Sequence, residues 1–329
     1  MSQSQAASFT QDVTLGEKNL TDPSLPSAPR KKRVVVTGGS GKLGRWVVRE
    51  MVEHGWQVLN LDKSAPAPSE KDVPARFIIA DLTNYGEVIA LLSELDAAYR
   101  GIDAVIHLAA LPAPGMAANH VIFHTNVTQT YNVLEAARVL RIQNIALASS
   151  ETVFGIPLNP HLPTKLPLTE EVERPESSYS LSKLLGEKMS EQFCRWDPEL
   201  KIINIRLSNV IPPEDYGKFQ TWQDDPWTRS WNGFGYIDPR DCAQAFRLSL
   251  EKPLKGTHVF NIANADSTYT APTADLVKKV FPTVQYTAET DNPRESLISI
   301  KKAREVLGYE PKYDWQSEIT KLQGHKNAA

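Results

Sequence analysis

The segment that most limits how this chain can fold is RVVVTGGSGKLGRWVVREM, residues 33–51. Its valines at 34–36 form a short β-branched run, as expected for a parallel strand that is buried on both faces. Glycines follow at 38, 39 and 41, and the apolar residues from Leu43 to Met51 recur at helical spacing. Strand, glycine turn and helix in this order predict a phosphate-binding βα unit, in which the helix N-terminus offers free N–H groups to an anion.

The glycines have distinct expected roles in this unit. Gly38 permits a tight turn, Gly41 lets the backbone approach a pyrophosphate, and Gly44 allows the helix to pack closely on the strand. The next strand, QVLNLD, ends in Asp62, 24 positions after Gly38. A carboxylate there accepts hydrogen bonds from both ribose hydroxyls of an adenosine and repels a 2′-phosphate. The sequence therefore predicts NAD as the cofactor and makes NADP less favoured, although Lys63 is a neighbouring cation that could accept a phosphate.

Strands and helices continue to alternate along the chain. We expect further strands at 75–82, 103–110, 144–150 and 201–208, and helices at 85–99, 121–140 and 178–196. This alternation predicts an α/β protein with a doubly wound parallel sheet and right-handed crossovers. Ligands of such sheets bind beyond the carboxyl ends of the strands. The residues at or just past those ends, which we expect to converge on one crevice, are Gly38, Asp62, Asp81, Ala109, Ser150 and Asn209.

Bulk properties exclude several classes of function. The 329 residues are 41% hydrophobic and carry a formal charge of −3, which permits a large core and offers no electrostatic attraction for nucleic acid or an anionic membrane. Two cysteines occur, in no metal-ligand spacing, and no apolar run approaches the ~20 residues of a membrane-spanning helix. We therefore predict a soluble, cytoplasmic protein without a metal. Residues 1–29, polar and without an amphipathic period, are predicted to be a disordered N-terminal extension.

Tyr179 and Lys183 lie four positions apart in the predicted helix 178–196, a spacing that decides nothing by itself. With Ser150 added, the chain resembles the extended short-chain dehydrogenase/reductase family, the NAD-dependent sugar epimerases and dehydratases. The matching segments are TGGSGKLG (37–44), DLT (81–83), HLAA (107–110), NVTQTYNVLEAA (126–137), SSETVFG (149–155), YSLSK (179–183), RLSNVIPP (206–213), YIDPRDCAQA (236–245) and KAREVLGYEP (302–311).

The resemblance implies a Rossmann-like, NAD-binding domain over 30–212 and a small substrate-binding lobe over 213–329, with strand and helix returns to the main domain. It also implies that Tyr179 is the catalytic acid/base, that Lys183 holds the nicotinamide ribose, and that Ser150 is the catalytic serine. A free phenol, with a pKa near ~10, is a poor base at neutral pH. A nearby ammonium and the positive nicotinamide ring both favour the phenolate, so we expect a lowered pKa for Tyr179.

Further contacts follow from the same resemblance, each with packing as its alternative. Besides Tyr179 and Lys183, the expected cofactor-binding residues are Gly38, Gly41, Lys42, Leu43, Gly44, Asp62, Asp81, Leu82, Ala109, Asn126 and Leu207. The expected substrate contacts are Ser150, Glu151, Asn209 and Arg294. The family often dimerises through the helices that match 121–140 and 178–196, which implies a possible homodimer.

The chain departs from the family pattern after the seventh matching segment. Asn209 and Tyr236 are only 27 positions apart, whereas sugar-nucleotide epimerases usually carry a longer insertion that helps clamp the nucleotide diphosphate. Three tryptophans stand in this short segment, and their faces suit either a sugar ring or the core of a small lobe. Arg294 lacks the Gly-Asp that usually follows it. Glu151 is uncommon after the catalytic serine, and it faces either the substrate hydroxyls or solvent.

These departures favour an NAD-dependent oxidoreductase for a smaller sugar or sugar-derived substrate, such as a free aldose or a sugar acid. A dehydrogenase does not need the diphosphate handle that holds a keto intermediate while the sugar turns. The alternative is a nucleotide-sugar epimerase or dehydratase with tightly bound NAD. A non-catalytic dinucleotide sensor is the alternative from another class, but a pure binding module has no need of the Tyr179 phenol.

Overall fold

The valine run lies at the centre of the fold. In a computed structural model of the chain, which describes residues 31–93 and 101–326, Arg33–Thr37 forms strand β1 and its three valines are fully buried. β1 pairs in parallel with β2 (Gln57–Asp62) on one side and with β4 (Ala104–His107) on the other. Val34 and Val36 belong to one core cluster and Val35 to another, because successive strand side chains point to opposite faces of the sheet.

Among the described residues, seven strands form the main sheet in the order β3-β2-β1-β4-β5-β7-β8, with every pair parallel. The other four strands are β3 (Arg76–Ile79), β5 (Asn144–Ser150), β7 (Lys201–Leu207) and β8 (Gly256–Ile262). A separate parallel pair joins β6 (Lys165–Leu166) to β9 (Gln285–Tyr286). The architecture is the predicted Rossmann-like, doubly wound α/β sheet.

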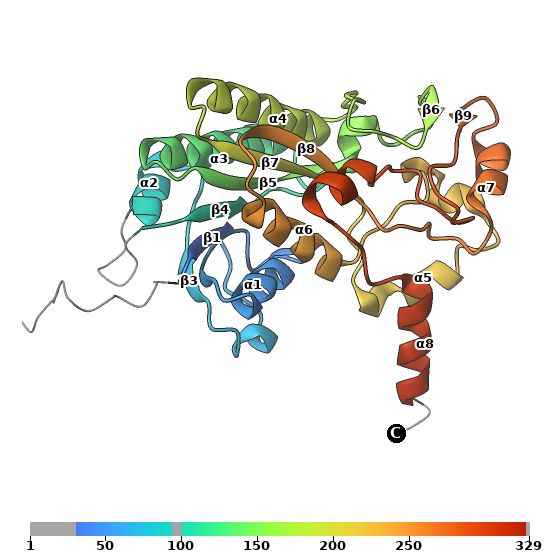
Figure 1. The fold of residues 1–329 in the computed structure, drawn as a ribbon, viewed down its shortest axis with the longest axis horizontal. Helices are drawn as coiled ribbons and strands as arrows, with labels where there is room; N and C mark the ends of the chain where they lie inside the picture. The colour runs from blue at the N-terminus through green and yellow to red at the C-terminus, as the bar shows by residue number, and fades with distance from the viewer. Residues whose placement is uncertain (1–30, 94–100, 327–329) are drawn as a thin grey trace, which may run out of the picture. The chain divides into compact units, whose positions relative to one another are not determined.

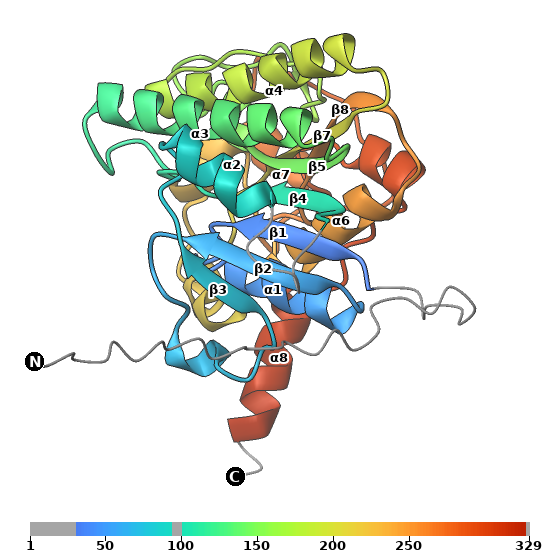
Figure 2. The ribbon, with the colours of Figure 1, turned by 90° about the vertical axis from the view of Figure 1, so that its left-hand side faces the viewer.

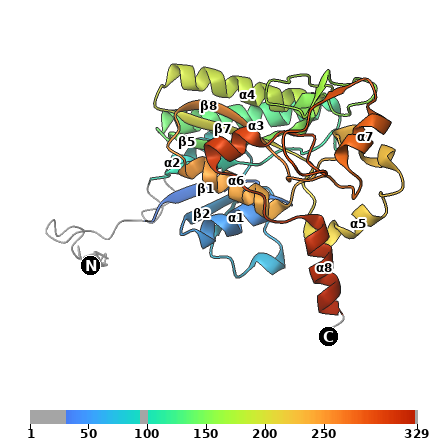
Figure 3. The same ribbon diagram turned by 45° about the vertical axis from the view of Figure 1, so that its right-hand side comes forward.

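Helices cover both faces of this sheet, as Figures 1 and 2 show. On one face lie α2 (Tyr85–Ser93), α3 (Asn119–Val139) and α4 (Ser178–Trp196), with α3 packed along both neighbours. On the other face α1 (Gly44–Glu53) packs against α6 (Pro239–Glu251), as Figure 3 also shows. Within the described ranges, no helix is long and apolar enough to cross a membrane.

Part of the second half of the chain belongs to the main layers, where β8 pairs with β7 and α6 packs on α1. The other short elements are η1 (Pro68–Glu70), η3 (Glu151–Phe154), η4 (Pro213–Asp215), α5 (Gly217–Gln220), η5 (Pro226–Asn232), α7 (Thr273–Val280), η6 (Ala303–Leu307) and α8 (Trp315–Lys326). The described chain from Lys32 onward forms one compact unit. The division into 30–212 and 213–329 therefore stays a prediction, and the predicted extension at 1–29 lies outside the described residues.

Most predicted elements are present, and two strands end earlier than predicted for identifiable reasons. The third strand stops at Ile79, because Asp81 forms a turn in which the N–H and hydroxyl of Thr83 donate to its carboxylate. The fourth stops at His107, because the chain beyond it leaves the sheet to line a cavity. The helix predicted at 85–99 is described as far as Ser93, and its last six positions lie outside the described residues.

A buried ion pair ties α4 to the sheet. Arg206 of β7 is fully buried, and its Nε and one terminal nitrogen donate to the two carboxylate oxygens of Glu187 at 2.9 and 2.7 Å. The other terminal nitrogen of Arg206 donates to the carbonyl oxygens of Glu170 and Val172, and Ser149 of β5 donates its hydroxyl to Glu187. A buried pair is tolerated when its remaining polar atoms find partners, as they do here across three elements.

We predict that Arg206→Met lowers the free energy of unfolding by about 3–5 kcal/mol, because it leaves the Glu187 charge buried without its counter-ion. Urea denaturation followed by circular dichroism measures this loss. The matched control is the double variant Arg206→Met, Glu187→Leu, which removes both charges and is expected to recover most of the stability. A loss below about 1 kcal/mol in the single variant would contradict the central role of this pair.

Candidate active site

A cavity of about 650 Å³ lies at the carboxyl ends of the strands, where doubly wound sheets bind their ligands. Five of the six residues expected to converge there line it: Gly38, Asp62, Ala109, Ser150 and Asn209. Asp81 is the exception, although its neighbours Ala80 and Leu82 reach the cavity. Hydrogen bonds from Thr83, and to a lesser degree the ammonium of Lys63, hold the pKa of Asp81 below its ordinary value. The Asp81 carboxylate thus serves the turn after β3, and a direct cofactor contact by it stays a prediction.

The glycine turn forms one end of the cavity. Gly38 has a φ of +70°, and a Cβ at this position would lie 2.7 Å from the backbone nitrogen of Ala109. A Cβ on Gly44 would lie 2.0 Å from the carbonyl oxygen of Gly38, so α1 can approach the turn this closely only without a side chain there. The N-terminus of α1 has no side-chain cap and no acidic residue in its first turn. The nitrogens of Arg45 and Trp46 donate to carbonyl oxygens within the turn, while the positive dipole end of α1 suits a diphosphate, whose binding here stays a prediction.

Asp62 lines the cavity at the end of β2 in a fixed orientation. Its two carboxylate oxygens accept hydrogen bonds from the backbone nitrogens of Ser40 at 3.0 Å and Ser64 at 3.1 Å. Lys63, the neighbouring cation that could accept the 2′-phosphate of NADP, pairs with Asp81 at 3.2 Å. A fixed carboxylate beside an already paired lysine suits free ribose hydroxyls better than a 2′-phosphate. The glycine turn and Asp62 together fit NAD.

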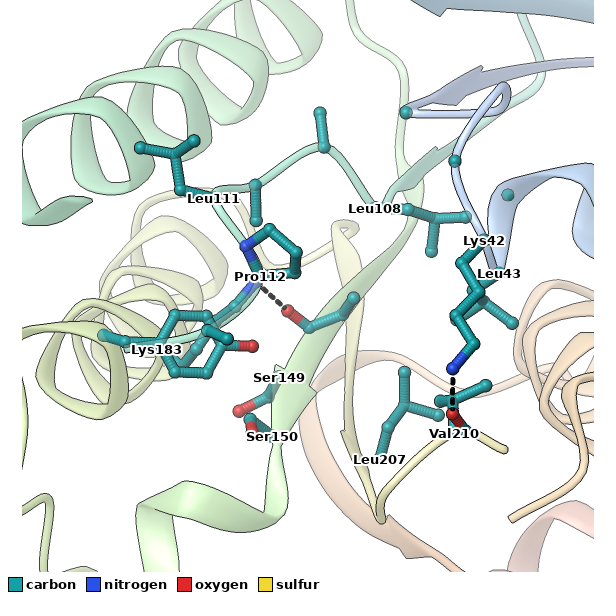
Figure 4. A pocket seen from close by; sticks show the side chains of 18 of the residues that line it. Lys42, Leu43, Leu108, Leu111, Pro112, Ser149, Ser150, Lys183, Leu207 and Val210 are labelled. Atoms are coloured by element: carbon teal, nitrogen blue, oxygen red, sulfur yellow. Dashed lines mark hydrogen bonds between the residues drawn. The ribbon is translucent and has the colours of Figure 1, made fainter. Parts of the chain in front are cut away.

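The three predicted catalytic residues, Ser150, Tyr179 and Lys183, line the same cavity. Figure 4 shows Ser150 and Lys183 on one wall and Lys42 and Leu43 on the opposite side. Tyr179 and Lys183 sit one turn apart at the start of α4, which a capping box fixes in place. The Lys183 ammonium donates to the carbonyl oxygen of Ala148 at 2.8 Å and lies 5.7 Å from the centre of the Tyr179 ring. The helix and the sheet thus place these groups together.

The protein environment alone does not activate the phenol. Burial raises the pKa of Tyr179 to about 12; a hydrogen bond with Ser150 opposes that shift, and the charge of Glu151 adds to it. Burial also lowers the pKa of Lys183 to about 8. The expected lowering of the Tyr179 pKa by Lys183 is therefore not found, since burial outweighs the effect of the neighbouring protein groups. A phenol that works near neutral pH here depends on the positive charge of oxidised nicotinamide.

The Ser150 hydroxyl is oriented by its neighbour. Its oxygen accepts hydrogen bonds from the backbone nitrogen and the hydroxyl of Thr152, at 3.1 and 3.0 Å. With its lone pairs engaged, Ser150 keeps its own hydrogen for donation. That hydrogen can go to the Tyr179 phenol or to a substrate oxygen in the cavity.

Asn126 does not line the cavity but supports its wall. Its side-chain oxygen accepts from the backbone nitrogen of Leu111 at 2.8 Å, and its amide donates to the Leu111 carbonyl at 3.1 Å. Gln129, three positions later on α3, donates to the carbonyl oxygen of Ala109 at 2.7 Å. These bonds fix the loop after β4, and a direct cofactor contact by Asn126 stays a prediction. Gln129 was not among the predicted site residues, although its spacing from Asn126 places both on one helix face.

Lys42, Leu43 and Leu207 line the cavity, and their contacts with the cofactor stay a prediction. The Lys42 ammonium donates to the carbonyl oxygen of Val210 at 2.8 Å, as Figure 4 shows. This bond links the glycine turn to the segment that follows β7. Burial lowers the pKa of Lys42.

Glu151 lines the cavity and is only 4% exposed, so the interpretation of a solvent-facing side chain is wrong. Its two carboxylate oxygens accept from the hydroxyl of Ser208 at 2.7 Å and from the amide of Asn232 at 3.1 Å. Burial raises the pKa of Glu151 to about 7, against the opposing effect of these hydrogen bonds and of Arg229. The carboxyl group thus faces the cavity in a fixed orientation beside Ser150.

The three tryptophans of the short segment lie in three different environments. Trp231 lines the cavity, Trp222 packs on the aromatic cluster around Phe219, and Trp227 is 52% exposed and has neither predicted role. Arg294, expected to contact the substrate, does not line the cavity and instead pairs with Asp266 at 3.0 Å. The geometry gives no support to that contact, which stays a prediction.

Besides Gln129, two parts of the site were not predicted from the sequence. One is an apolar wall after β4, built by Leu111, Pro112, Ala113 and Pro114. Its sequence signal is the proline-rich LPAP that directly follows the matching segment HLAA. The other is the pair Ser208 and Asn232 that holds Glu151. Asn232 gives no local signal, because it meets Glu151 across 81 positions of the chain.

Comparison with known proteins identifies the family. The profile of the NAD dependent epimerase/dehydratase family matches residues 34–223, more than half of the chain. The chain belongs to this family. It is therefore an NAD-dependent enzyme of the extended short-chain dehydrogenase/reductase type.

The similar proteins differ in the reactions that their names describe. UDP-glucose 4-epimerase of Lactobacillus helveticus is 26% identical over 90% of this chain and 97% of its own. The NAD-dependent glucose-6-phosphate dehydrogenase of Haloferax volcanii is 25% identical over 87% of this chain and 95% of its own. The crystal structure of UDP-glucose 4-epimerase with UDP-glucose from Thermotoga maritima has a TM-score of 0.66 at 22% identity, covering 90% of this chain and 100% of that one. That likeness establishes the shared fold.

We predict that Asp62→Ala weakens NADH binding by about tenfold, the loss of roughly one good hydrogen-bonding partner, and narrows the gap between NADH and NADPH. Quenching of protein fluorescence by each dinucleotide gives both dissociation constants. Asp224→Ala, at an exposed carboxylate of the lobe, is the matched control and is expected to change neither. An unchanged NADH to NADPH ratio in Asp62→Ala would place the ribose contact elsewhere.

Proposed function

We propose that this protein is an oxidoreductase that transfers a hydride between NAD and a hydroxyl-bearing or carbonyl carbon of a small polyhydroxylated substrate, such as a free aldose or a sugar acid. The observation that carries this proposal is the gathering of Ser150, Tyr179 and Lys183 on one wall of the cavity that also holds the glycine turn and Asp62. A phenol, a hydroxyl donor and an ammonium in that arrangement can move a proton at a substrate oxygen.

The chain's own groups perform the proton part of the reaction. In oxidation, Ser150 donates a hydrogen bond to the substrate hydroxyl oxygen and fixes its position. Tyr179 takes the proton from that oxygen as the carbon loses its hydride, and in reduction it returns the proton. Lys183 is held by Ala148 at the base of α4, where it can bind the nicotinamide ribose. Bound NAD supplies the hydride acceptor in oxidation, and its reduced form supplies the donor in reduction.

The size of the lobe supports a substrate smaller than a nucleotide sugar. Of the segment between Asn209 and Tyr236, Val210 and Trp231 line the cavity. Phe219 is fully buried in the lobe's aromatic core, so much of this short segment builds structure and offers little to a diphosphate. The Haloferax relative, named as a glucose-6-phosphate dehydrogenase, shows by its name that a sequence of this kind can accompany a substrate without a nucleotide.

A nucleotide-sugar epimerase is the second candidate. The names of the Lactobacillus relative and of the Thermotoga structure favour it. In that reaction the same Tyr179 would remove and return one proton while NAD stays bound. A dehydratase is less well supported, because an acidic pair is usual there and Thr152 follows Glu151 in this chain.

The deciding experiment mixes purified protein with NAD and a panel of free aldoses, sugar acids and nucleotide sugars, and follows NADH at 340 nm. We expect NADH with a free sugar or sugar acid, and a loss of about 10²–10⁴-fold in kcat for Tyr179→Phe with NAD binding retained. Tyr85→Phe, at a half-exposed tyrosine of α2, is the matched control. An isomerised nucleotide sugar without NADH would replace this proposal with the epimerase, and full turnover by Tyr179→Phe would remove Tyr179 from its acid/base role.

We also propose that the protein is cytoplasmic and forms a homodimer through α3 and α4. The two helices pack side by side on one face of the sheet, as Figures 1 and 2 show. Large apolar side chains are exposed on both, namely Val121, Tyr131 and Val139 on α3 and Leu181 and Trp196 on α4. Such exposed apolar groups on adjacent helices suit a four-helix contact between two copies.

Both cysteines are free thiols, which suits a reducing compartment such as the proposed cytoplasm.

Light scattering coupled to size-exclusion chromatography tests the dimer. We expect twice the chain mass for the native protein and a monomer for Tyr131→Glu combined with Leu181→Glu, because two buried like charges per copy oppose association. Val306→Glu, on the distant η6 segment, is the control and is expected to remain dimeric. A native protein that elutes as a monomer at micromolar concentration would refute this interface.

A further inference from the structure

The charges that line the cavity are distributed unevenly. Among the described lining residues, the cations are Lys42, Lys63 and Lys183. Each of them already has a protein partner: Lys42 donates to Val210, Lys63 pairs with Asp81, and Lys183 donates to Ala148. We define the substrate end of the cavity as Ser150, Glu151, Asn209 and Trp231. The charged residue among these four is the acidic Glu151.

Glu151 is built into this end and is not a loose surface group. Its carboxylate accepts from Ser208 at the end of β7 and from Asn232 in η5, so both oxygens are anchored from different elements. A carboxylate offers about four acceptor positions, and two protein hydrogen bonds leave room for donors from a ligand. Substrate hydroxyl groups are donors of the required kind.

The positive charge that acts on Glu151 belongs to Arg229. Arg229 does not line the cavity, and one of its terminal nitrogens donates to the carbonyl oxygen of Gly235 at 2.8 Å. Its guanidinium lies 4.8 Å from the ring centre of Trp231 and 5.0 Å from that of Trp222. Arg229 therefore balances the Glu151 charge without being offered to the substrate.

The remaining surface of the substrate end is neutral. Of its other three residues, Trp231 is apolar, and Ser150 and Asn209 are polar but uncharged; Leu111 and Pro112, elsewhere in the cavity lining, are apolar as well. An anionic group on a substrate would meet the carboxylate of Glu151 in a water-poor site in which the lysines of the lining already have protein partners, and like charges brought together in this way repel each other. A hydroxyl group at the same place would donate to that carboxylate.

We propose that Glu151 is a specificity-determining residue that admits neutral polyhydroxylated sugars and rejects sugars carrying a carboxylate or a phosphate. The inference rests on the proposed function and narrows it, because it chooses the free aldose over the sugar acid and also disfavours the diphosphate of a nucleotide sugar. Glu151 acts by contact with the substrate, while Ser208 and Asn232 position it.

The test compares an aldose, its uronic acid and its 6-phosphate of the same stereochemistry, in the gluco and galacto series, by kcat/KM with NAD. We expect the native protein to prefer the neutral sugar over the uronate by at least about tenfold, and Glu151→Gln to reduce this ratio by about tenfold, because the variant keeps the shape and removes the charge. Glu305→Gln, at an exposed glutamate of η6, is the matched control and is expected to keep the native ratio. Retained NADH binding verifies that Glu151→Gln is folded.

A pH series on the native protein gives an independent readout that needs no variant. Because burial raises the pKa of Glu151 to about 7, its charge appears as pH rises from 6 to 8. A uronate stays ionised throughout this range, since carboxyl groups of its kind titrate near ~3.5. Ionisation of Tyr179, Lys183 or Arg229 affects the neutral sugar as well, so the ratio of the two kcat/KM values isolates the discrimination between them. We expect the ratio of kcat/KM for the neutral sugar to kcat/KM for the uronate to rise from pH 6 to 8 in the native protein. The same ratio is expected to stay constant in Glu151→Gln.

The outcomes separate the two proposals. The role of Glu151 is overturned if the uronate or the 6-phosphate gives NADH at least as efficiently as the neutral sugar. It is also overturned if Glu151→Gln leaves the ratio of kcat/KM for the neutral sugar to that for the uronate unchanged. Either result leaves the proposed oxidoreductase in place. NADH from none of the sugars overturns the proposed function and, with it, this selectivity. If a nucleotide sugar is turned over in preference, both proposals give way to the epimerase.

Discussion

The buried pair of Arg206 and Glu187 is the interaction on which the site most depends. It joins β7 to α4, and through the Ser149 hydroxyl it reaches β5 as well. Ser150 is the last residue of β5, and on α4 Lys183 lies about one turn and Tyr179 about two turns before Glu187. The alignment of a helix with a sheet is otherwise set by apolar packing, which is adjustable by small shifts. A bidentate ion pair has a fixed geometry, so it holds the phenol and the serine in one register.

The cavity divides into a half that many chains of this family can share and a half that is particular to this one. The glycine turn and Asp62 offer N–H groups, a dipole and a carboxylate, which suit a dinucleotide whatever the substrate is. The substrate end is built from the serine wall, the apolar loop after β4 and one tryptophan of the lobe. The membership of the chain in the epimerase/dehydratase family thus accounts for the half of the cavity that suits NAD. The substrate of the other half has to be determined by experiment.

Burial sets the electrostatics of this site in a consistent direction. It raises the pKa of Tyr179 and of Glu151 and lowers that of Lys183, because each group loses water in its charged form. The protein groups by themselves therefore favour the protonated phenol. For the acid/base role proposed for Tyr179, the positive charge of oxidised nicotinamide would favour the phenolate.

The sequence by itself determined the strand and helix order, the glycine turn, Asp62, and the set Ser150, Tyr179 and Lys183. The strand and helix order, the glycine turn and Asp62 are local signals, since each depends on side-chain periodicity or on spacing within one or two elements. The set Ser150, Tyr179 and Lys183 was implied by the resemblance of segments along the whole chain to one family. Only the tertiary structure decided that Glu151 is buried, that Arg294 pairs with Asp266, and that Asn232 donates to Glu151. Those facts join residues that are distant in the chain, and burial and charge pairing depend on which segments pack together, which no single segment encodes.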